Sequence, residues 1–354
     1  MTETKIKVLI VDDSRLVRDI LRSIFLMDKS MEVVGSAVDP IDAREKIKSL
    51  NPDVITLDIE MPKMDGLTFL RNLMRLRPTP VVMISTLTEK GADATLQALE
   101  LGAIDFIAKP KIKIESEFPA LADEILRKVR CAARAKVAPF QPPEKPSAPV
   151  AVTAGGLACD LLAIGASTGG TEAIKTVLLA LPANVPPIVI VQHMPPGFTQ
   201  SFANRLNELL PFDVIEFSGR NEPLKPGVVY LANGAEHMIV ETHRGLLTAS
   251  VDDGAPVNRH KPSVDVLFRS VAKLPELRTI GVILTGMGMD GAKGLLDMRQ
   301  AGAHTIAQDK ESSVVWGMPR IASEIGAAEL VLPLNKIGTA IGNRLFASRR
   351  GEAL

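Results

Sequence analysis

The chain has 354 residues, of which 46% are hydrophobic, a share typical of folded domains and too high for a disordered chain. Lys and Arg together number 41, as do Asp and Glu, so no excess of positive charge indicates binding to nucleic acid. This length predicts two domains. The first residues, MTETKIKVLIVDD, lack the apolar run of a signal peptide or a membrane span, and only two cysteines are present. We therefore expect a cytoplasmic protein that does not insert into a membrane.

In the first part of the chain, apolar runs of strand length alternate with amphipathic helical stretches. The apolar runs are residues 7–11, 31–37, 54–58, 80–85 and 105–109. Residues 14–25 and 121–129 each place their apolar side chains on one helical face. Five strand–helix units predict an α/β domain with a doubly wound parallel sheet.

Polar residues follow four of these strands. They are Asp12, Asp13, Asp58, Ser85 and Lys109. The carboxyl ends of parallel strands meet at one edge of the sheet, where ligands bind. Three carboxylates there repel one another and suit a hard cation such as Mg²⁺, while the lysine adds positive charge and the serine a hydroxyl for a transferred oxygen. The alternative is a set of solvated charges at strand ends.

This combination of VDDS, DIEMPKMDG around Asp58, a serine at position 85 and Lys109-Pro110 resembles a bacterial response-regulator receiver domain over residues 5–128. The resemblance implies that a histidine kinase phosphorylates Asp58. The implied Mg²⁺ ligands are Asp12, Asp13, Asp58 and the backbone carbonyl of Glu60. Ser85 and Phe106 match the family's switch hydroxyl and switch aromatic residue, with phenylalanine in place of the commoner tyrosine.

A proline-rich segment separates the two halves of the chain. Five prolines lie between Pro139 and Pro149, which excludes a regular helix or a central strand and indicates a semi-extended tether. We expect a receiver domain over residues 1–128, the end of its last helix and a Pro/Ala-rich linker over 129–157, and a second domain over 158–350.

The second half repeats the alternation of strands and helices. Strands are expected at residues 161–167, 187–193, 227–233 and 279–286, and an antiparallel hairpin at 237–250. The fold prediction is therefore two doubly wound parallel-sheet domains joined by a proline-rich linker.

One turn of this half carries a serine between glycines. In LLAIGASTGGTEAI, Ser167 lies between Gly165 and Gly169, where a strand gives way to a helix. Such a turn binds phosphate at a helix N-terminus, exposes a nucleophilic hydroxyl, or is a turn without chemistry. A dinucleotide-binding Gly-x-Gly-x-x-Gly would need glycine at position 167, and no P-loop Gly-Lys-Ser/Thr follows.

An imidazole and a carboxylate come from other strand ends of the same half. His193 ends one strand and Asp290 lies in the glycine-rich GMGMDGA after another, so a nucleophile, a base and an orienting carboxylate are all available. Their order differs from that of α/β-hydrolases. His260, in a polar loop, is a rival for the base, and we favour His193 because its strand should lie beside that of Ser167. The residues alone leave open a serine hydrolase and an output domain without catalysis.

The second half also resembles a known family, on the motifs IGASTGG, QHMPPGFT, HKPSVDVLF, LTGMGMDGAKGL and QDxxSSVVWGMP. Residues 160–346 are similar to the catalytic domain of chemotaxis protein-glutamate methylesterases. The resemblance implies Ser167 as nucleophile, His193 as general base and Asp290 as its orienting carboxylate. It also implies an oxyanion-binding N–H at Met287 and a pocket-shaping role for Thr168.

What this resemblance implies about activity is specific. The substrates are γ-glutamyl methyl esters on the cytoplasmic helices of chemoreceptors, methanol is released, and many members also deamidate receptor glutamines. A histidine kinase would supply the phosphoryl group, and no metal is expected in the catalytic domain. The alternatives are a hydrolase for another ester or for peptides, and a module that only binds a partner.

Overall fold

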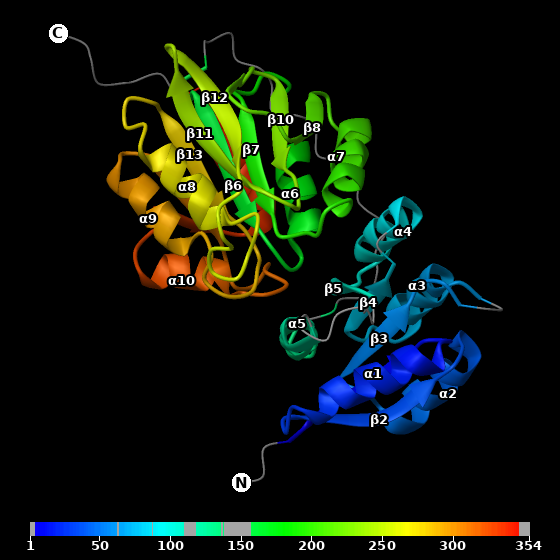
Figure 1. The fold of residues 1–354 in the computed structure, drawn as a ribbon. Helices are drawn as coiled ribbons and strands as arrows, with labels where there is room; N and C mark the ends of the chain where they lie inside the picture. The colour runs from blue at the N-terminus through cyan, green and yellow to red at the C-terminus, as the bar shows by residue number, and fades with distance from the viewer. Residues whose placement is uncertain are drawn as a thin grey trace. The chain divides into compact units, whose positions relative to one another are not determined.

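The computed structural model describes residues 4–61, 64–86, 88–109, 118–135, 137 and 157–346. The chain forms two compact units, residues 1–143 and 144–354 (Figure 1). The expected linker, residues 129–157, lies largely outside the described residues. Its first residues, up to Ala132, belong to the last helix of the first unit.

The first unit is a five-stranded sheet flanked by helices. Its strands are β1 (Ile6–Val11), β2 (Met31–Ala37), β3 (Val54–Asp58), β4 (Val81–Ser85) and β5 (Asp105–Ala108). Its helices are α1 (Arg15–Leu26), α2 (Pro40–Leu50), α3 (Gly66–Leu76), α4 (Glu89–Glu100) and α5 (Phe118–Ala132). The strand order is β2-β1-β3-β4-β5 and every pair is parallel, so the predicted doubly wound sheet is confirmed.

Strand order explains why the acidic residues meet. The direction of strand succession reverses between β1 and β3, which pair directly, with Val11 opposite Leu57. The residues that follow this pair in register are Asp12 and Asp58, and ligands bind at such a reversal in open α/β sheets. All of β3 is buried, because helices cover both faces of the sheet.

The second unit holds a larger parallel sheet. Its strands are β6 (Leu161–Ala166), β7 (Ile188–Gln192), β8 (Asp213–Phe217), β10 (Val228–Ala232), β13 (Thr279–Ile283), β14 (His304–Gln308) and β15 (Leu330–Leu332), in the order β15-β14-β13-β6-β7-β10-β8. A small antiparallel sheet contains β9 (Glu222–Pro223), β11 (His237–His243) and β12 (Leu246–Asp252).

Six helices of the described residues 157–346 accompany these strands. They are α6 (Gly170–Leu179), α7 (Phe198–Leu209), α8 (Val264–Ala272), α9 (Ala292–Gln300), α10 (Met318–Glu324) and α11 (Leu334–Leu345). Helices α8, α9 and α10 pack side by side in front of the sheet in Figure 1, and α6 lies behind it, in contact with α7 and α11. No helix of the described residues combines the length and the apolarity needed to cross a membrane.

The sequence predicted four parallel strands and a hairpin in this unit, and all five features are confirmed. Strands β8, β9, β14 and β15 were missed. β8 and β15 are edge strands with several exposed residues, so their hydrophobic pattern is weak. β14 is short and begins with an exposed histidine, although the rest of it is buried.

The centre of this sheet is again a reversal point. The chain passes from β6 to its neighbour β7, completes that side, and later returns to β13 on the other side of β6. The segments that follow β6, β7 and β13 therefore meet at the carboxyl edge of the sheet.

Candidate functional site

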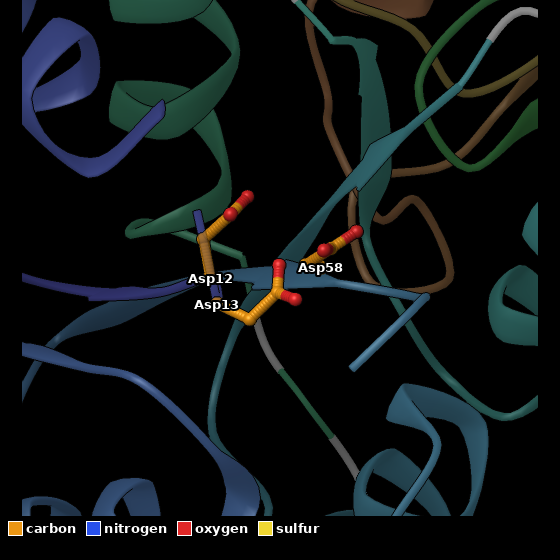
Figure 2. Close-up of side chains that lie close together, drawn as sticks. All are labelled: Asp12, Asp13 and Asp58. Carbon is orange, nitrogen blue, oxygen red and sulfur yellow. The ribbon is translucent and has the colours of Figure 1, made fainter. Parts of the chain in front are cut away.

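In the first unit, three carboxylates converge where β1 and β3 end (Figure 2). Asp12, Asp13 and Asp58 each offer one oxygen, and these oxygens all lie within 4.8 Å of one another. Asp12 and Asp58 are buried and Asp13 is exposed, so the cluster opens to solvent on one side. Lys109 Nζ lies 2.8 Å from Asp58 Oδ2 and supplies the positive charge that was predicted at this edge.

The electrostatics of the cluster favour a bound cation. Burial raises the pKa of Asp58, against the opposing effect of Lys109. Burial and then the nearby charge of Asp58 raise the pKa of Asp12 to about 6. Asp12 Oδ2 is buried and makes no hydrogen bond to the described residues, which is costly for a carboxylate oxygen. Carboxylate oxygens in this arrangement suit a divalent cation such as Mg²⁺.

The remaining predicted residues of this unit surround the cluster. The N–H of Glu60 donates to Asp58 Oδ1 over 3.3 Å. The buried Ser85 hydroxyl lies 2.7 Å from that of Thr95 and 3.1 Å from the carbonyl oxygen of Gly91, so its hydrogen bonds run to α4. Phe106 is buried.

Sequence reasoning missed Lys128, which contacts the predicted switch aromatic. Its Nζ donates to the carbonyl oxygen of Phe106 over 2.7 Å, lies 5.1 Å from the ring centroid, and forms an ion pair with Asp105. Lys128 lies in α5 between the predicted core residues Ile125 and Val129, and no sequence motif distinguishes it from other lysines.

In the second unit, Ser167 occupies the turn from β6 to α6. The N–H of Ser167 donates to the carbonyl oxygen of Thr285, and the carbonyl oxygen of Ser167 accepts a hydrogen bond from Gln192 Nε2 over 2.9 Å. The turn is thus held by the segments after β13 and β7. Gly169 has φ +77°, and a β-carbon there would lie 2.7 Å from Val314, so the turn requires glycine.

His193 and Asp290 form a buried pair beside this turn. Ala166 and Gln192 are register partners of β6 and β7, so Ser167 and His193 follow neighbouring strands at the same level. His193 Nε2 lies 2.9 Å from Asp290 Oδ2. Burial alone would raise the pKa of Asp290, but hydrogen bonds and the charge of His193 outweigh it and hold that pKa well below its usual range. Nε2–H therefore donates to a carboxylate.

The N-terminus of α8 stabilises this carboxylate. Asp290 accepts hydrogen bonds from Val264 N–H (2.7 Å), Asp265 N–H (3.3 Å), the Ser263 hydroxyl (2.7 Å) and Asn258 Nδ2 (2.8 Å). The first N–H groups of a helix have no partner within the helix, and the helix dipole favours a negative charge there. The structure thus supplies Asp290 with donors on both oxygens.

Two glycines allow α8 to come this close. A β-carbon at Gly165 of β6 would lie 2.1 Å from Val264 Cγ1, and one at Gly291, beside Asp290, would lie 2.4 Å from the same atom. Only glycine fits at either position. Strand β6, the Asp290 loop and the first residue of α8 therefore meet at one point.

The other side of the histidine ring is stacked. The ring of His260 lies parallel to that of His193, with centroids 3.7 Å apart and an interplanar angle of 9°. His193 Nδ1 is buried and has no hydrogen-bond partner among the described residues. Sequence reasoning treated His260 as a rival base and gave it no place near the β6 strand, so this contact was missed.

The expected oxyanion residues lie against Ser167. A β-carbon on Gly286 would lie 2.8 Å from Ser167 Cβ, which brings the segment containing Met287 beside the serine. Thr168 is buried, and its carbonyl oxygen accepts a hydrogen bond from Thr285 Oγ1 over 3.0 Å. A hydroxyl, an imidazole held by a carboxylate, and a glycine-rich loop thus meet at one sheet edge, an arrangement suited to acyl transfer.

Comparisons with known proteins point in the same direction. Residues 162–341 match the family model of the CheB methylesterase, and residues 8–116 match that of the response regulator receiver domain. A protein-glutamate methylesterase/protein-glutamine glutaminase 1 of Xanthomonas euvesicatoria pv. vesicatoria is 55% identical over 344 residues, covering 95% of this chain and 96% of its own. A protein-glutamate methylesterase/protein-glutamine glutaminase of Chromohalobacter salexigens is 52% identical and covers 99% of both chains.

Among solved structures, the catalytic domain of the CheB methylesterase of Thermotoga maritima is similar to the second unit. It is 40% identical, with a TM-score of 0.51, and the match covers 53% of this chain and 99% of that one.

Proposed function

The chain belongs to the CheB methylesterase family, with a receiver domain ahead of its methylesterase domain, and we propose that Ser167, His193 and Asp290 carry out its chemistry. The enzyme is a protein-glutamate methylesterase and protein-glutamine glutaminase that acts on chemoreceptors under the control of phosphorylation. The observation that carries the proposed triad is the buried His193–Asp290 hydrogen bond beside the serine turn of the neighbouring strand.

In this mechanism Nδ1 of His193 is the base. Because Nε2–H donates to Asp290, Nδ1 is the nitrogen that can accept the proton of the Ser167 hydroxyl. These two atoms are not hydrogen-bonded in the structure, and such bonds often form only when substrate is present. The carboxylate of Asp290 holds the ring in this tautomer and stabilises the imidazolium that forms.

Ser167 Oγ then attacks the ester carbonyl carbon of a glutamate methyl ester. The negative charge that develops on the carbonyl oxygen is stabilised by backbone N–H groups, for which we propose Met287, with Thr168 shaping the pocket. His193 returns its proton to the departing oxygen, and methanol leaves. Water deprotonated by the same nitrogen hydrolyses the acyl-serine.

Deamidation of a receptor glutamine uses the same steps with ammonia as the leaving group. An amide nitrogen leaves only when protonated, so this reaction depends more strongly on proton return from His193. No metal ion has a role in this part of the proposal.

In the receiver domain we propose that Asp58 accepts the phosphoryl group. Asp12, Asp13, Asp58 and the carbonyl of Glu60 would hold Mg²⁺, which when bound offsets the negative charge of phosphate and carboxylates. Lys109 would give up its ion pair with the Asp58 carboxylate and bind a phosphoryl oxygen instead. Ser85 would turn from its α4 partners toward the phosphoryl group, and Phe106 would repack with it.

The proposed partners follow from this chemistry. They are the methylated cytoplasmic helices of chemoreceptors as substrate and a histidine kinase as phosphodonor, which requires a cytoplasmic enzyme. Neither membrane insertion nor nucleic-acid binding is part of the proposal.

One experiment tests the proposal. Purified protein is incubated with methylated chemoreceptor, with and without a small phosphodonor and Mg²⁺, and the released methanol is measured. Methanol release that rises with the phosphodonor and disappears in Ser167→Ala supports the proposal. Methanol release by the Ser167→Ala variant contradicts the proposed nucleophile. If the wild-type protein releases no methanol, the proposed substrate is wrong.

A further inference from the structure

A single asparagine side chain joins two buried carboxylates behind the His193–Asp290 pair. Asn258 Nδ2 lies 2.8 Å from Asp290 Oδ1 and 2.8 Å from Asp265 Oδ2. A primary amide nitrogen carries two hydrogens, so it can donate one to each carboxylate. Asp265 and Asp290 are both almost fully buried, at 2% and 1% exposure.

The surroundings of Asp265 differ from those of Asp290. Asp265 Oδ1 accepts the N–H of Gly294 over 2.7 Å, and the guanidinium NH2 of Arg269 lies 3.7 Å from Oδ2. Burial, together with the charge of Asp290, raises the pKa of Asp265, whereas that of Asp290 is lowered. Two neighbouring carboxylates tend to share one proton, because both cannot easily be charged.

The backbone presents Asn258 in an uncommon conformation. Asn258 and Arg259 have φ values of +52° and +69°, and the bridge between Val257 and His260 closes a tight turn around them. Asparagine adopts the left-handed region more readily than most residues, whereas arginine is strained there. Unusual backbone of this kind gathers at functional sites. The same turn also carries His260 to the ring of His193.

We infer that Asn258 is a positioning residue of the esterase: by donating to both Asp265 and Asp290 it keeps a proton from being shared between them, so that Asp290 stays a full carboxylate toward His193. This inference rests on the proposed triad. Without the amide, a protonated Asp265 could donate to Asp290 and withdraw charge from the hydrogen bond to His193. The base would then lose part of the negative partner that stabilises its imidazolium form.

Other titratable groups contact the pair from neighbouring elements. His193, which follows β7, contacts Asp290, and Arg269 of α8 contacts Asp265. Arg269 also contacts Asp297 of α9. His237 from β11 bonds through Nδ1 to the N–H of Ser263, whose hydroxyl donates to Asp290. These contacts remain when Asn258 is changed, so a shift in the pH profile would report on the bridge.

The test compares Asn258→Gly and Asn258→Asp in the full-length protein. Glycine keeps the positive φ and removes the amide, while aspartate keeps the size and tolerates the backbone but brings a third carboxylate instead of a donor. Arg244→Gly is the control, because Arg244 is exposed at φ +51° in the β11–β12 turn and lies outside the site. Turnover and KM for methanol release are measured from pH 5.5 to 9 with phosphodonor present.

We expect Asn258→Gly to lower kcat by about ten- to a hundredfold with little change in KM, and to move the acid limb of the pH profile downward by about one unit. The sign follows because a weaker carboxylate charge stabilises the imidazolium form of His193 less, so the base stays neutral to a lower pH. Asn258→Asp should be slower still at neutral pH, and Arg244→Gly should match the wild type.

If Asn258 only shapes the turn, both variants will keep a kcat near that of the wild type and the acid limb will not move, which overturns the inference. Wild-type kcat in Asn258→Gly overturns it too. Ser167→Ala, measured in the same assay, distinguishes failure of the proposed triad from failure of the inference about Asn258. An active Ser167→Ala contradicts the triad whatever the Asn258 variants show. Thermal unfolding of each variant shows that activity is compared between folded proteins, and either Asn258 variant alone decides the acid-limb question.

Discussion

Replacing Asp290 by asparagine tests how the carboxylate acts in the proposed triad, because the side chain keeps its size and loses its charge. Its two oxygens have different surroundings. Oδ2 faces His193 and the rigid N–H of Val264 at 2.7 Å. Oδ1 faces the Ser263 hydroxyl, which can turn to accept, the Asn258 amide, and the N–H of Asp265 at a longer 3.3 Å. We therefore expect the new amide NH₂ on the Oδ1 side and its oxygen still toward the histidine.

This orientation sets the size of the effect. With the tautomer of His193 retained, the loss is mainly that of attraction between a carboxylate and the imidazolium of the transition state. Over about 4 Å and at an effective dielectric constant of about 20, that attraction is about 4 kcal/mol. The corresponding loss in kcat is about a thousandfold. With the amide turned the other way, the proton would sit on Nδ1, and the loss would reach about ten-thousandfold.

The assay is methanol release from methylated chemoreceptor at saturating phosphodonor, with Asp213→Asn as the control. Asp213 is exposed at the start of the edge strand β8, so its neutralisation should leave turnover unchanged. An Asp290→Asn enzyme within tenfold of the wild type would refute the reasoning, because no buried counter-charge for His193 would then be needed.

The same substitution predicts a pH-dependent loss of stability. The folded-state pKa of Asp290 is lowered, so its carboxylate contributes stability above the unfolded value of about 3.9, and this contribution is lost as pH falls through the folded pKa. Denaturant unfolding of wild type and Asp290→Asn should therefore differ clearly at pH 7 and converge toward pH 2. A difference that stays constant over this range contradicts the assignment.

Ser167→Ala should reduce methanol release by about a millionfold in turnover while leaving phosphorylation intact, and activity within a few-fold of the wild type contradicts the nucleophile. His193→Gln should nearly eliminate turnover, whereas His260→Gln should lose the stacking contact with His193 and about tenfold or less of the turnover in the same assay. Asp58→Asn should retain basal methanol release and show no response to phosphodonor, and a fragment of residues 151–354 should be active without phosphodonor. A fragment no faster than the resting full-length protein would mean that the receiver activates by a positive contact.

The sequence predicted the parts of both sites that depend on strand order. Asp12 and Asp58 follow paired strands, and so do Ser167 and His193, because polar residues at the carboxyl ends of a parallel sheet gather at one edge. Asp290 could be found in the same way, since it follows β13 on the other side of β6. These positions depend on local hydrophobic runs and a topological rule, which a single sequence contains.

The residues of the esterase site that sequence reasoning missed come from the loop before α8 and from the first turn of that helix. Asn258 and His260 reach the site because of a tight turn with two left-handed residues, and neither has a periodic pattern or a characteristic spacing to the triad. Asp265 reads as an ordinary acidic residue in the first turn of a helix. Its burial depends on the packing of α8 against α9, a tertiary contact that local sequence does not contain.

The meeting of Val264 with two glycines has an evolutionary consequence. Gly165 lies in the strand that leads to Ser167, and Gly291 follows Asp290, yet both are limited in size by the same valine side chain. A larger residue at position 165 can be accepted only if position 264 becomes smaller, so substitutions at these two sites should covary among relatives. At position 291 the φ of +84° requires glycine whatever residue stands at 264. Replacing glycine by alanine to stabilise the protein, a standard engineering step where the backbone permits it, would here push α8 away from the carboxylate it supports.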